Sequence, residues 1–285
     1  MKLANIHLNT HVSKVSCMST SCQNPIGLFD SGVGGLTIMR EVVRELPHEN
    51  MIYLGDTARL PYGNKSPQAV LRYTLDGVSF LLERKIKLLI VACFTASSHA
   101  LYALEQRLSI PVIGVIQSGI EELMARAGSK RVALLGTAST IKSGVLQTLI
   151  LERSPSAAIF PIACPLLAPL IEEGLSDHPA TKMILGHYLT PLLEETIDSA
   201  LLACTHYPLI RTAIQEILGS SVQLIEPAKR TALEAKERLA SHGLLNLNKR
   251  EPTYEFYATD DPDKFHRLTN QFFGSEIKEV KEFKG

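Results

Sequence analysis

Two cysteines, Cys93 and Cys204, each end a run of apolar residues, and each is followed closely by a threonine, Thr95 or Thr205. A short apolar run of this kind predicts a buried parallel strand. Because ligands bind at the carboxyl ends of strands in open α/β sheets, both thiols are expected at such a binding edge. Two thiols on opposite sides of one carbon could remove a proton from one face and return one to the other.

The duplication extends beyond the two cysteine motifs to other predicted strand ends. Segment 26–31 has a counterpart at 132–137, segment 112–118 has one at 222–227, and Cys93 has one at Cys204. The pairs keep their order at a separation of about 110 residues, which is far too long for a solenoid repeat. Apolar strands recur in any α/β protein, which is the simpler explanation. Three matched pairs instead favour two related lobes with a cleft between their strand ends.

Strand patterns alternate with helical patterns, which predicts an α/β fold with mostly parallel sheets in two pseudosymmetric lobes. The predicted strands are 26–29, 51–54, 88–92, 112–116, 132–135, 158–162, 200–203, 222–225 and 254–258. The predicted helices are 35–45, 67–84, 97–108, 119–127, 141–151, 179–195, 208–218, 228–241 and 262–273. We predict a loose N-terminal extension (1–24), a discontinuous first lobe (25–116 plus 230–285) and a second lobe (117–229).

The composition narrows the class of protein. The chain has 285 residues, 45% of them hydrophobic, with 29 Lys+Arg against 29 Asp+Glu. This balance provides no basic field for nucleic acid, and no apolar stretch reaches the ~18 residues that predict a membrane span. Five cysteines and no export signal predict free thiols in a reducing cytoplasm.

Two further segments follow predicted strands and contain turn residues. Asp30 and Ser31 precede glycines at 32, 34 and 35, which would let backbone N–H groups approach an anion, although a simple helix cap fits equally well. The spacing is not that of a dinucleotide-binding loop. The segment 56–63, which contains Tyr62 and Gly63, is either an ordinary loop or a loop that contacts substrate.

Other roles for the cysteines remain open at this point. Free cysteine is most often buried and inert, and Cys93 and Cys204 could also form a disulfide or bind a metal. The chain lacks CxxC and HxxH motifs, so a metal site is poorly supported. A thiol at a helix N-terminus is expected to have a lowered pKa, and His206 could assist the ionisation of Cys204.

The motifs together resemble those of the glutamate racemases, members of the aspartate/glutamate racemase superfamily that use no cofactor. The resemblance runs from about Pro25 to the end. It includes FDSGVGGLT (29–37), YLGDTARLPYGNKS (53–66), VACFTAS (91–97), LLGTASTIKSG (134–144), PLIEEG (169–174), ACTHYPL (203–209) and YATDDPDKF (257–265). Two cysteine motifs and two loop motifs agree in order and spacing, which makes the resemblance specific.

The resemblance implies a set of site residues. Cys93 and Cys204 would be the acid/base thiols, assisted by Asp30 and His206, with Glu172 behind His206. The implied substrate contacts are Asp30, Ser31, Tyr62, Gly63, Phe94, Thr95, Thr137, Thr140, Thr205 and His206. The resemblance also implies a homodimer that makes D-glutamate for peptidoglycan, and hence for cell-wall biogenesis and cell shape, in the cytoplasm. No cofactor, metal, nucleic acid or membrane is expected to take part.

This chain departs from the family pattern at one important position. Phe94 follows the first cysteine, where the family has asparagine, and a phenyl ring neither donates nor accepts the hydrogen bonds of a carboxamide. Losing one such contact would cost on the order of 1–3 kcal/mol. Two alternatives follow, namely a racemase for another small amino acid and a low-activity binding or regulatory homologue. Ala203 and Glu226 are milder departures.

Overall fold

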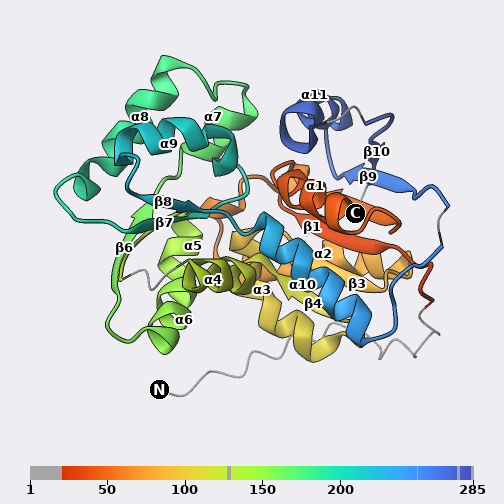
Figure 1. Cartoon of the computed structure of the whole chain (residues 1–285). Helices are drawn as coiled ribbons and strands as arrows, with labels where there is room; N and C mark the ends of the chain where they lie inside the picture. Colours follow the sequence, from red (N-terminus) through yellow and green to blue (C-terminus); the bar gives the residue numbers. More distant parts are fainter. Residues whose placement is uncertain (1–20, 127–129, 249, 275–276, 284–285) are drawn as a thin grey trace.

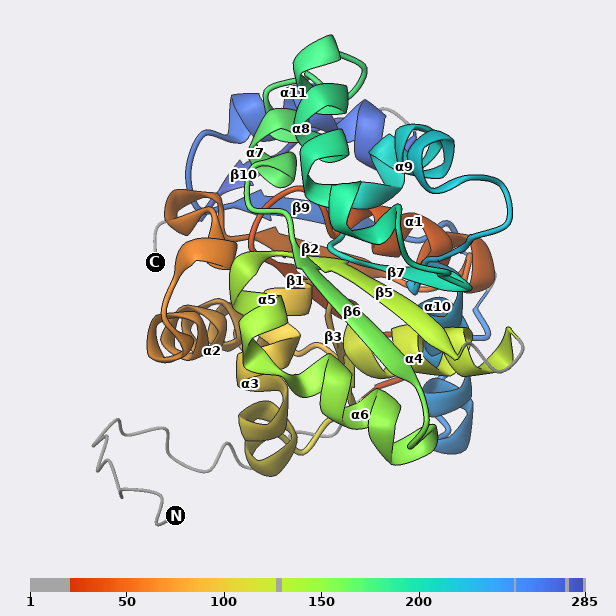
Figure 2. The same ribbon diagram turned by 90° about the vertical axis from the view of Figure 1, so that its left-hand side faces the viewer.

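The structure is a computed structural model that describes residues 21–126, 130–248, 250–274 and 277–283. The predicted extension over residues 1–24 therefore lies almost entirely outside the described residues. Within the described part, the chain forms two separate parallel sheets with helices packed around them (Figures 1 and 2). This arrangement confirms the predicted α/β class with two lobes.

The first sheet has six strands in the order β10-β9-β2-β1-β3-β4, and all its pairings are parallel. The strands are β1 (Ile26–Asp30), β2 (Met51–Gly55), β3 (Leu88–Val91), β4 (Val112–Gly114), β9 (Tyr254–Ala258) and β10 (Lys281–Glu282). The first four are buried along their whole length. Helices on both faces of a parallel sheet require such continuous apolar runs.

The second sheet has four strands in the order β6-β5-β7-β8, again all parallel. They are β5 (Arg131–Gly136), β6 (Ala158–Ala163), β7 (Ser199–Ala203) and β8 (Gln223–Ile225). Its strand order repeats that of β2-β1-β3-β4 in the first sheet, with β5 in the place of β1 and β7 in the place of β3. The duplication seen in the sequence is therefore a duplication of topology.

The strand register aligns the two cysteine motifs. Phe29 on β1 pairs with Val91 on β3, and Gly136 on β5 pairs with Ala203 on β7. Continuing each register past the strand ends places Ser31 beside Cys93 and Thr137 beside Cys204. Each lobe thus brings one thiol and one hydroxyl to the carboxyl edge of its sheet.

The described helices surround and connect the sheets. They are α1 (Leu36–Glu45), α2 (Pro67–Glu83), α3 (Phe94–Arg107), α4 (Val115–Ala125), α5 (Ala138–Ser143), α6 (Val145–Arg153), α7 (Leu167–Glu172), α8 (Pro179–Leu189), α9 (Arg211–Leu218), α10 (Ala228–Ser241) and α11 (Pro262–Phe273). Among them, α4 contacts strands of both sheets and packs against α10. The chain then re-enters the first sheet through β9 and β10. The exact lobe boundaries stay a prediction.

Several predicted element boundaries are wrong, for local reasons. The strand predicted at 112–116 ends at Gly114 because α4 begins at Val115. The helix predicted at 141–151 is two helices, separated at Gly144, whose φ of 71° is in the left-handed region that favours glycine. The helix predicted at 179–195 ends at Leu189 and continues as a short 3₁₀ turn. Helix α7 was not predicted, since it has only six residues and contains a proline.

No helix within the described residues is long and apolar enough to cross a membrane.

Candidate active site

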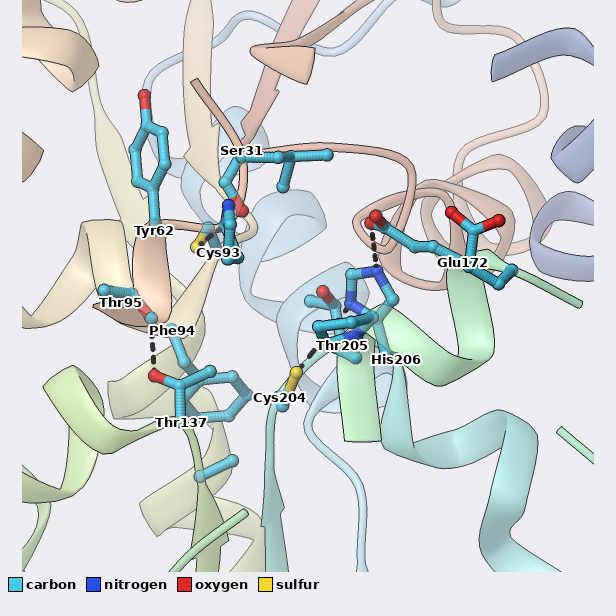
Figure 3. A pocket seen from close by; sticks show the side chains of 17 residues that line it. Ser31, Tyr62, Cys93, Phe94, Thr95, Thr137, Glu172, Cys204, Thr205 and His206 are labelled. Atoms are coloured by element: carbon cyan, nitrogen blue, oxygen red, sulfur yellow. Dashed lines mark hydrogen bonds and ion pairs between the residues drawn. The ribbon is translucent and has the colours of Figure 1, made fainter. Parts of the chain in front are cut away.

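A cavity of about 140 Å³ lies where the strand ends of the two lobes meet (Figure 3). Most of the predicted site residues line it, namely Ser31, Tyr62, Gly63, Cys93, Phe94, Thr95, Thr137, Glu172, Cys204, Thr205 and His206. Asp30 and Thr140 are fully buried and lie behind the lining residues. None of the described residues that line the cavity is a lysine or an arginine, so hydroxyls and backbone N–H groups are the donors available to an anionic ligand.

Cys93 caps the N-terminus of α3, which begins at Phe94, three residues earlier than predicted. Its Sγ accepts a hydrogen bond from the Ala96 N–H at 3.5 Å and lies 3.4 Å from Ser31 Oγ. The expected lowering of its pKa is not observed. Burial, with a further contribution from the negative charge of Asp30, raises the pKa of Cys93 to about 12 despite these hydrogen bonds. Cys93 is therefore a protonated thiol at neutral pH.

Asp30 ends β1 beneath Cys93. Its Oδ1 accepts a hydrogen bond from the Gly32 N–H at 2.8 Å, and its Oδ2 accepts one from Thr205 Oγ1 of the other lobe at 3.4 Å. Burial raises the pKa of Asp30, while the nearby His206 opposes that rise. The carboxyl group thus contacts Thr205, the residue that follows Cys204 in the other lobe.

Cys204 begins a chain of three residues that leads away from the cavity. Its Sγ lies 3.8 Å from His206 Nδ1, and His206 Nε2 lies 2.8 Å from Glu172 Oε1 at the end of α7 (Figure 3). Burial alone would lower the pKa of His206, but the interactions with Cys204 and Glu172 together raise it well above its usual value. Both interactions therefore favour the protonated form of the imidazole beside the Cys204 sulfur.

Three threonine hydroxyls join the lobes beside the cavity. Thr95 Oγ1 on α3 lies 2.9 Å from Thr137 Oγ1 and 3.0 Å from Thr140 Oγ1, and the last two oxygens are 2.9 Å apart. Thr95 and Thr137 line the cavity, whereas Thr140 supports them from behind. The hydroxyls of Thr95 and Thr137 can turn their protons toward a ligand.

The loop that contains Tyr62 forms part of the cavity wall. The Tyr62 hydroxyl donates to Asp56 Oδ2 and points away from Cys93 in Figure 3. A Cβ at Gly63 would lie 2.7 Å from Thr137 Cβ, so the glycine allows the loop of one lobe to approach the other. The Phe94 ring is buried and forms an apolar part of the wall.

Sequence reasoning missed other parts of the wall. Leu60, Pro61, Ala168, Pro169 and Glu173 also line the cavity. The two prolines lie in segments that the sequence had marked, namely the loop before Tyr62 and the PLIEEG motif. Among the described residues, no group of three or more His, Cys, Asp or Glu side chains is arranged to hold a metal ion.

The arrangement is suited to proton transfer at a carbon atom. One wall presents a protonated thiol, and the facing lobe presents a second thiol in contact with a histidine whose pKa is raised. Such a pair can supply an acid on one side of a small ligand and a base on the other.

Comparisons with known proteins agree with this geometry. The sequence model of the Asp/Glu/hydantoin racemases matches residues 26–235, and the chain belongs to this family. Within it, the chain lies among the glutamate racemases, which are isomerases. The glutamate racemase of Geobacter metallireducens is 44% identical over 255 residues, covering 90% of this chain and 94% of the relative. The glutamate racemase of Chlorobaculum tepidum is 42% identical over 261 residues, covering 91% of this chain and 96% of the relative.

Solved structures give the same assignment. Glutamate racemase isoform RacE1 of Bacillus anthracis superposes with a TM-score of 0.87 at 36% identity, covering 92% of this chain and 97% of that one. The Francisella tularensis glutamate racemase in complex with D-glutamate gives a TM-score of 0.87 at 33% identity. The match covers 92% of this chain and 98% of that one.

Proposed function

We propose that this protein interconverts L- and D-glutamate with Cys93 and Cys204 as the two acid/base groups. The observation that carries the proposal is the placement of these thiols in one small cavity, each at the carboxyl edge of its own lobe. The glutamate racemases of similar sequence, and the D-glutamate complex of similar structure, support glutamate as the substrate.

The reaction requires one thiolate and one thiol. The thiolate takes the proton from Cα, and the opposite thiol gives its own proton to the other face of the resulting carbanion. The product leaves with the protonation states of the two sulfurs exchanged. A turnover in the reverse direction, or proton exchange with water, restores the starting state.

The surroundings of the two thiols support different starting roles. The raised pKa of Cys93 suits it to donate a proton first. Cys204 contacts an imidazole with a raised pKa, anchored by Glu172, which suits Cys204 to act first as the base. The roles reverse for the other enantiomer.

The substrate carboxylates would be bound without a lysine or an arginine among the described residues of the cavity wall. Ser31, Thr95 and Thr137 supply hydroxyl donors, and the N-terminus of α3 supplies backbone N–H groups. Helix N-termini and hydroxyls are established anion ligands, and they also stabilise negative charge as it develops during proton removal. Tyr62 and Gly63 would confine the substrate from the loop side.

The activity test is direct. Purified protein should convert either enantiomer of glutamate to the racemate, followed by circular dichroism. A protein that leaves both enantiomers unchanged would refute the proposal. We further propose that the protein acts in the cytoplasm as a homodimer and supplies D-glutamate for peptidoglycan. Rescue of a bacterial D-glutamate auxotroph tests the supply of D-glutamate from the cytoplasm, and analytical ultracentrifugation tests the homodimer.

A second candidate function has one specific observation in its favour. The Phe94 ring lines the cavity and offers no hydrogen bond to a side-chain carboxylate. The alternatives are racemisation of another small amino acid, or a binding or regulatory role with little turnover. A panel of amino acids in the same assay separates these from glutamate racemisation.

A further inference from the structure

The ring of His206 is held by residues from the opposite lobe. A Cβ at Gly34 would lie 2.5 Å from both Cε1 and Nδ1 of His206, so the backbone of the β1–α1 loop lies directly against the ring. Phe272, at the end of α11, meets the same ring at a centroid distance of 5.3 Å and an interplanar angle of 80°. Gly34 and Phe272 both belong to elements that pack on the first sheet.

Helix α11 has other contacts that hold it near His206. Lys264 Nζ lies 2.6 Å from Glu173 Oε1, next to Glu172, and Gln271 Nε2 donates to Ser176 Oγ at 2.9 Å. Lys264 and Glu173 are exposed, so this ion pair contributes little. Phe272 is fully buried, and its contact with His206 is the one that water cannot replace.

We propose that Phe272 is a positioning residue for the reaction, holding the His206 ring so that one nitrogen faces Cys204 and the other faces Glu172. The proposal rests on the proposed function. Hydrogen bonds at its two nitrogens leave an imidazole free to tilt about the line between them, and a packed neighbour removes that freedom. Because Phe272 comes from the other lobe, the assistance to Cys204 is complete only when the lobes are in contact.

The chain provides a matched control on the same helix. Phe273 is also buried, but its ring packs against Phe256 on β9, at a centroid distance of 5.7 Å, whereas the Phe272 ring packs against His206. Phe272→Leu and Phe273→Leu therefore remove the same group from neighbouring buried positions. Both variants should lower the melting temperature, and only Phe272→Leu should affect the chemistry.

The experiment compares kinetics and histidine NMR for the wild type and the two variants. Phe272→Leu should lower kcat about tenfold, equivalent to about 1.4 kcal/mol, with KM changed less than about twofold. The signals of His206, assigned with a His206→Gln variant, should shift, and the His206 pKa should fall toward its ordinary value as the bonds to Cys204 and Glu172 weaken. The buried carboxylate of Asp30 also faces His206, but neither variant changes its contacts.

An isotope measurement adds a readout of the individual thiols. With Cα-deuterated substrate, Phe272→Leu should raise the primary isotope effect on kcat/KM for the enantiomer whose proton Cys204 removes, and should not raise it for the other. Phe273→Leu should retain the wild-type values.

Equal losses of kcat in the two variants, or unchanged His206 signals in Phe272→Leu, would overturn the proposal. If Phe272→Leu does not fold, Phe272→Met preserves more of the side-chain volume and takes its place. A wild-type protein that fails to racemise glutamate would refute the proposed function instead, while the NMR comparison would still report on the positioning of His206.

Discussion

Thr205 of the second lobe donates a hydrogen bond to Asp30 of the first, with Oγ1 and Oδ2 separated by 3.4 Å. The backbone oxygen of Thr205 also accepts a hydrogen bond from Thr37 Oγ1 at 3.2 Å. The segment that presents Cys204 is thus held by side chains of the lobe that presents Cys93. Contacts between the lobes therefore set the geometry of the two thiols, and a change in one lobe is expected to affect chemistry at the thiol of the other.

Replacing either active thiol should abolish racemisation. Cys93→Ser and Cys204→Ser each leave one face of Cα without a proton carrier, because a serine hydroxyl is a far weaker acid than a thiol. Each variant should still eliminate a leaving group from one enantiomer of a β-substituted glutamate, which needs only one base. Cys164→Ser is the control, since Cys164 is buried but does not line the cavity. Wild-type racemisation by either active-site variant would rule out the two-thiol mechanism.

Phe94→Asn should raise kcat/KM for glutamate by roughly tenfold, which corresponds to one restored hydrogen bond of about 1.4 kcal/mol. The side chain lines the cavity next to Cys93, where a carboxamide could bind a carboxylate. Phe94→Leu controls for the change in volume alone. Steady-state kinetics on both glutamate enantiomers and a small amino-acid panel provide the measurement.

The opposite result for Phe94 would also be informative. Lower activity of Phe94→Asn on another amino acid, with glutamate still poorly used, would indicate that the ring is adapted to that substrate. Unchanged rates on every substrate would mean that position 94 has no influence on the bound ligand.

Activity should not depend on a metal, pyridoxal phosphate or a nucleotide. The two thiols supply both proton-transfer groups, so the mechanism assigns no step to a cofactor. Protein dialysed against a chelator and free of cofactor absorbance should racemise at the original rate. Activity lost on dialysis and recovered only with a metal or pyridoxal phosphate would contradict this.

His206 should make the stability of the protein depend on pH. Its pKa is raised in the folded state, so the folded protein binds this proton more tightly than the unfolded chain does. Its contribution is fully present below the ordinary histidine pKa of about 6.5 and is lost as the pH rises through the higher folded value. The difference in the free energy of unfolding between wild type and His206→Gln, measured with urea, should therefore shrink from pH 6 to alkaline pH. A difference that grows over this range would show the opposite sign of the pKa shift.

The site residues at the strand ends could be predicted from the sequence, because ligands bind at the carboxyl ends of the strands in parallel sheets. Cys93 and Cys204 were found from apolar runs and a repeat, and their shared cavity follows from the matched strand order of the two sheets. Glu172 came only from the family resemblance, because nothing in its local pattern connects it with His206.

Other features depended on tertiary structure. The pKa of Cys93 was expected to fall at a helix N-terminus, but burial and Asp30 outweigh the helix in the folded protein. Phe272 and Phe273 are adjacent phenylalanines at the end of α11, and both are buried. The sequence alone does not distinguish their roles. Only the packing of the lobes distinguishes the one that contacts His206 from the one that contacts the sheet.

The central claim is that two thiols act on opposite faces of Cα, and proton NMR in D₂O tests it most directly. L-Glutamate is incubated with the protein, and both enantiomers are analysed before the reaction has proceeded far. The account predicts D-glutamate that carries deuterium at Cα, while the remaining L-glutamate retains its hydrogen, because the base that removes the proton differs from the acid that returns one. Deuterium appearing equally early in the remaining L-glutamate, or D-glutamate that keeps the original hydrogen, would indicate a single base and contradict the account.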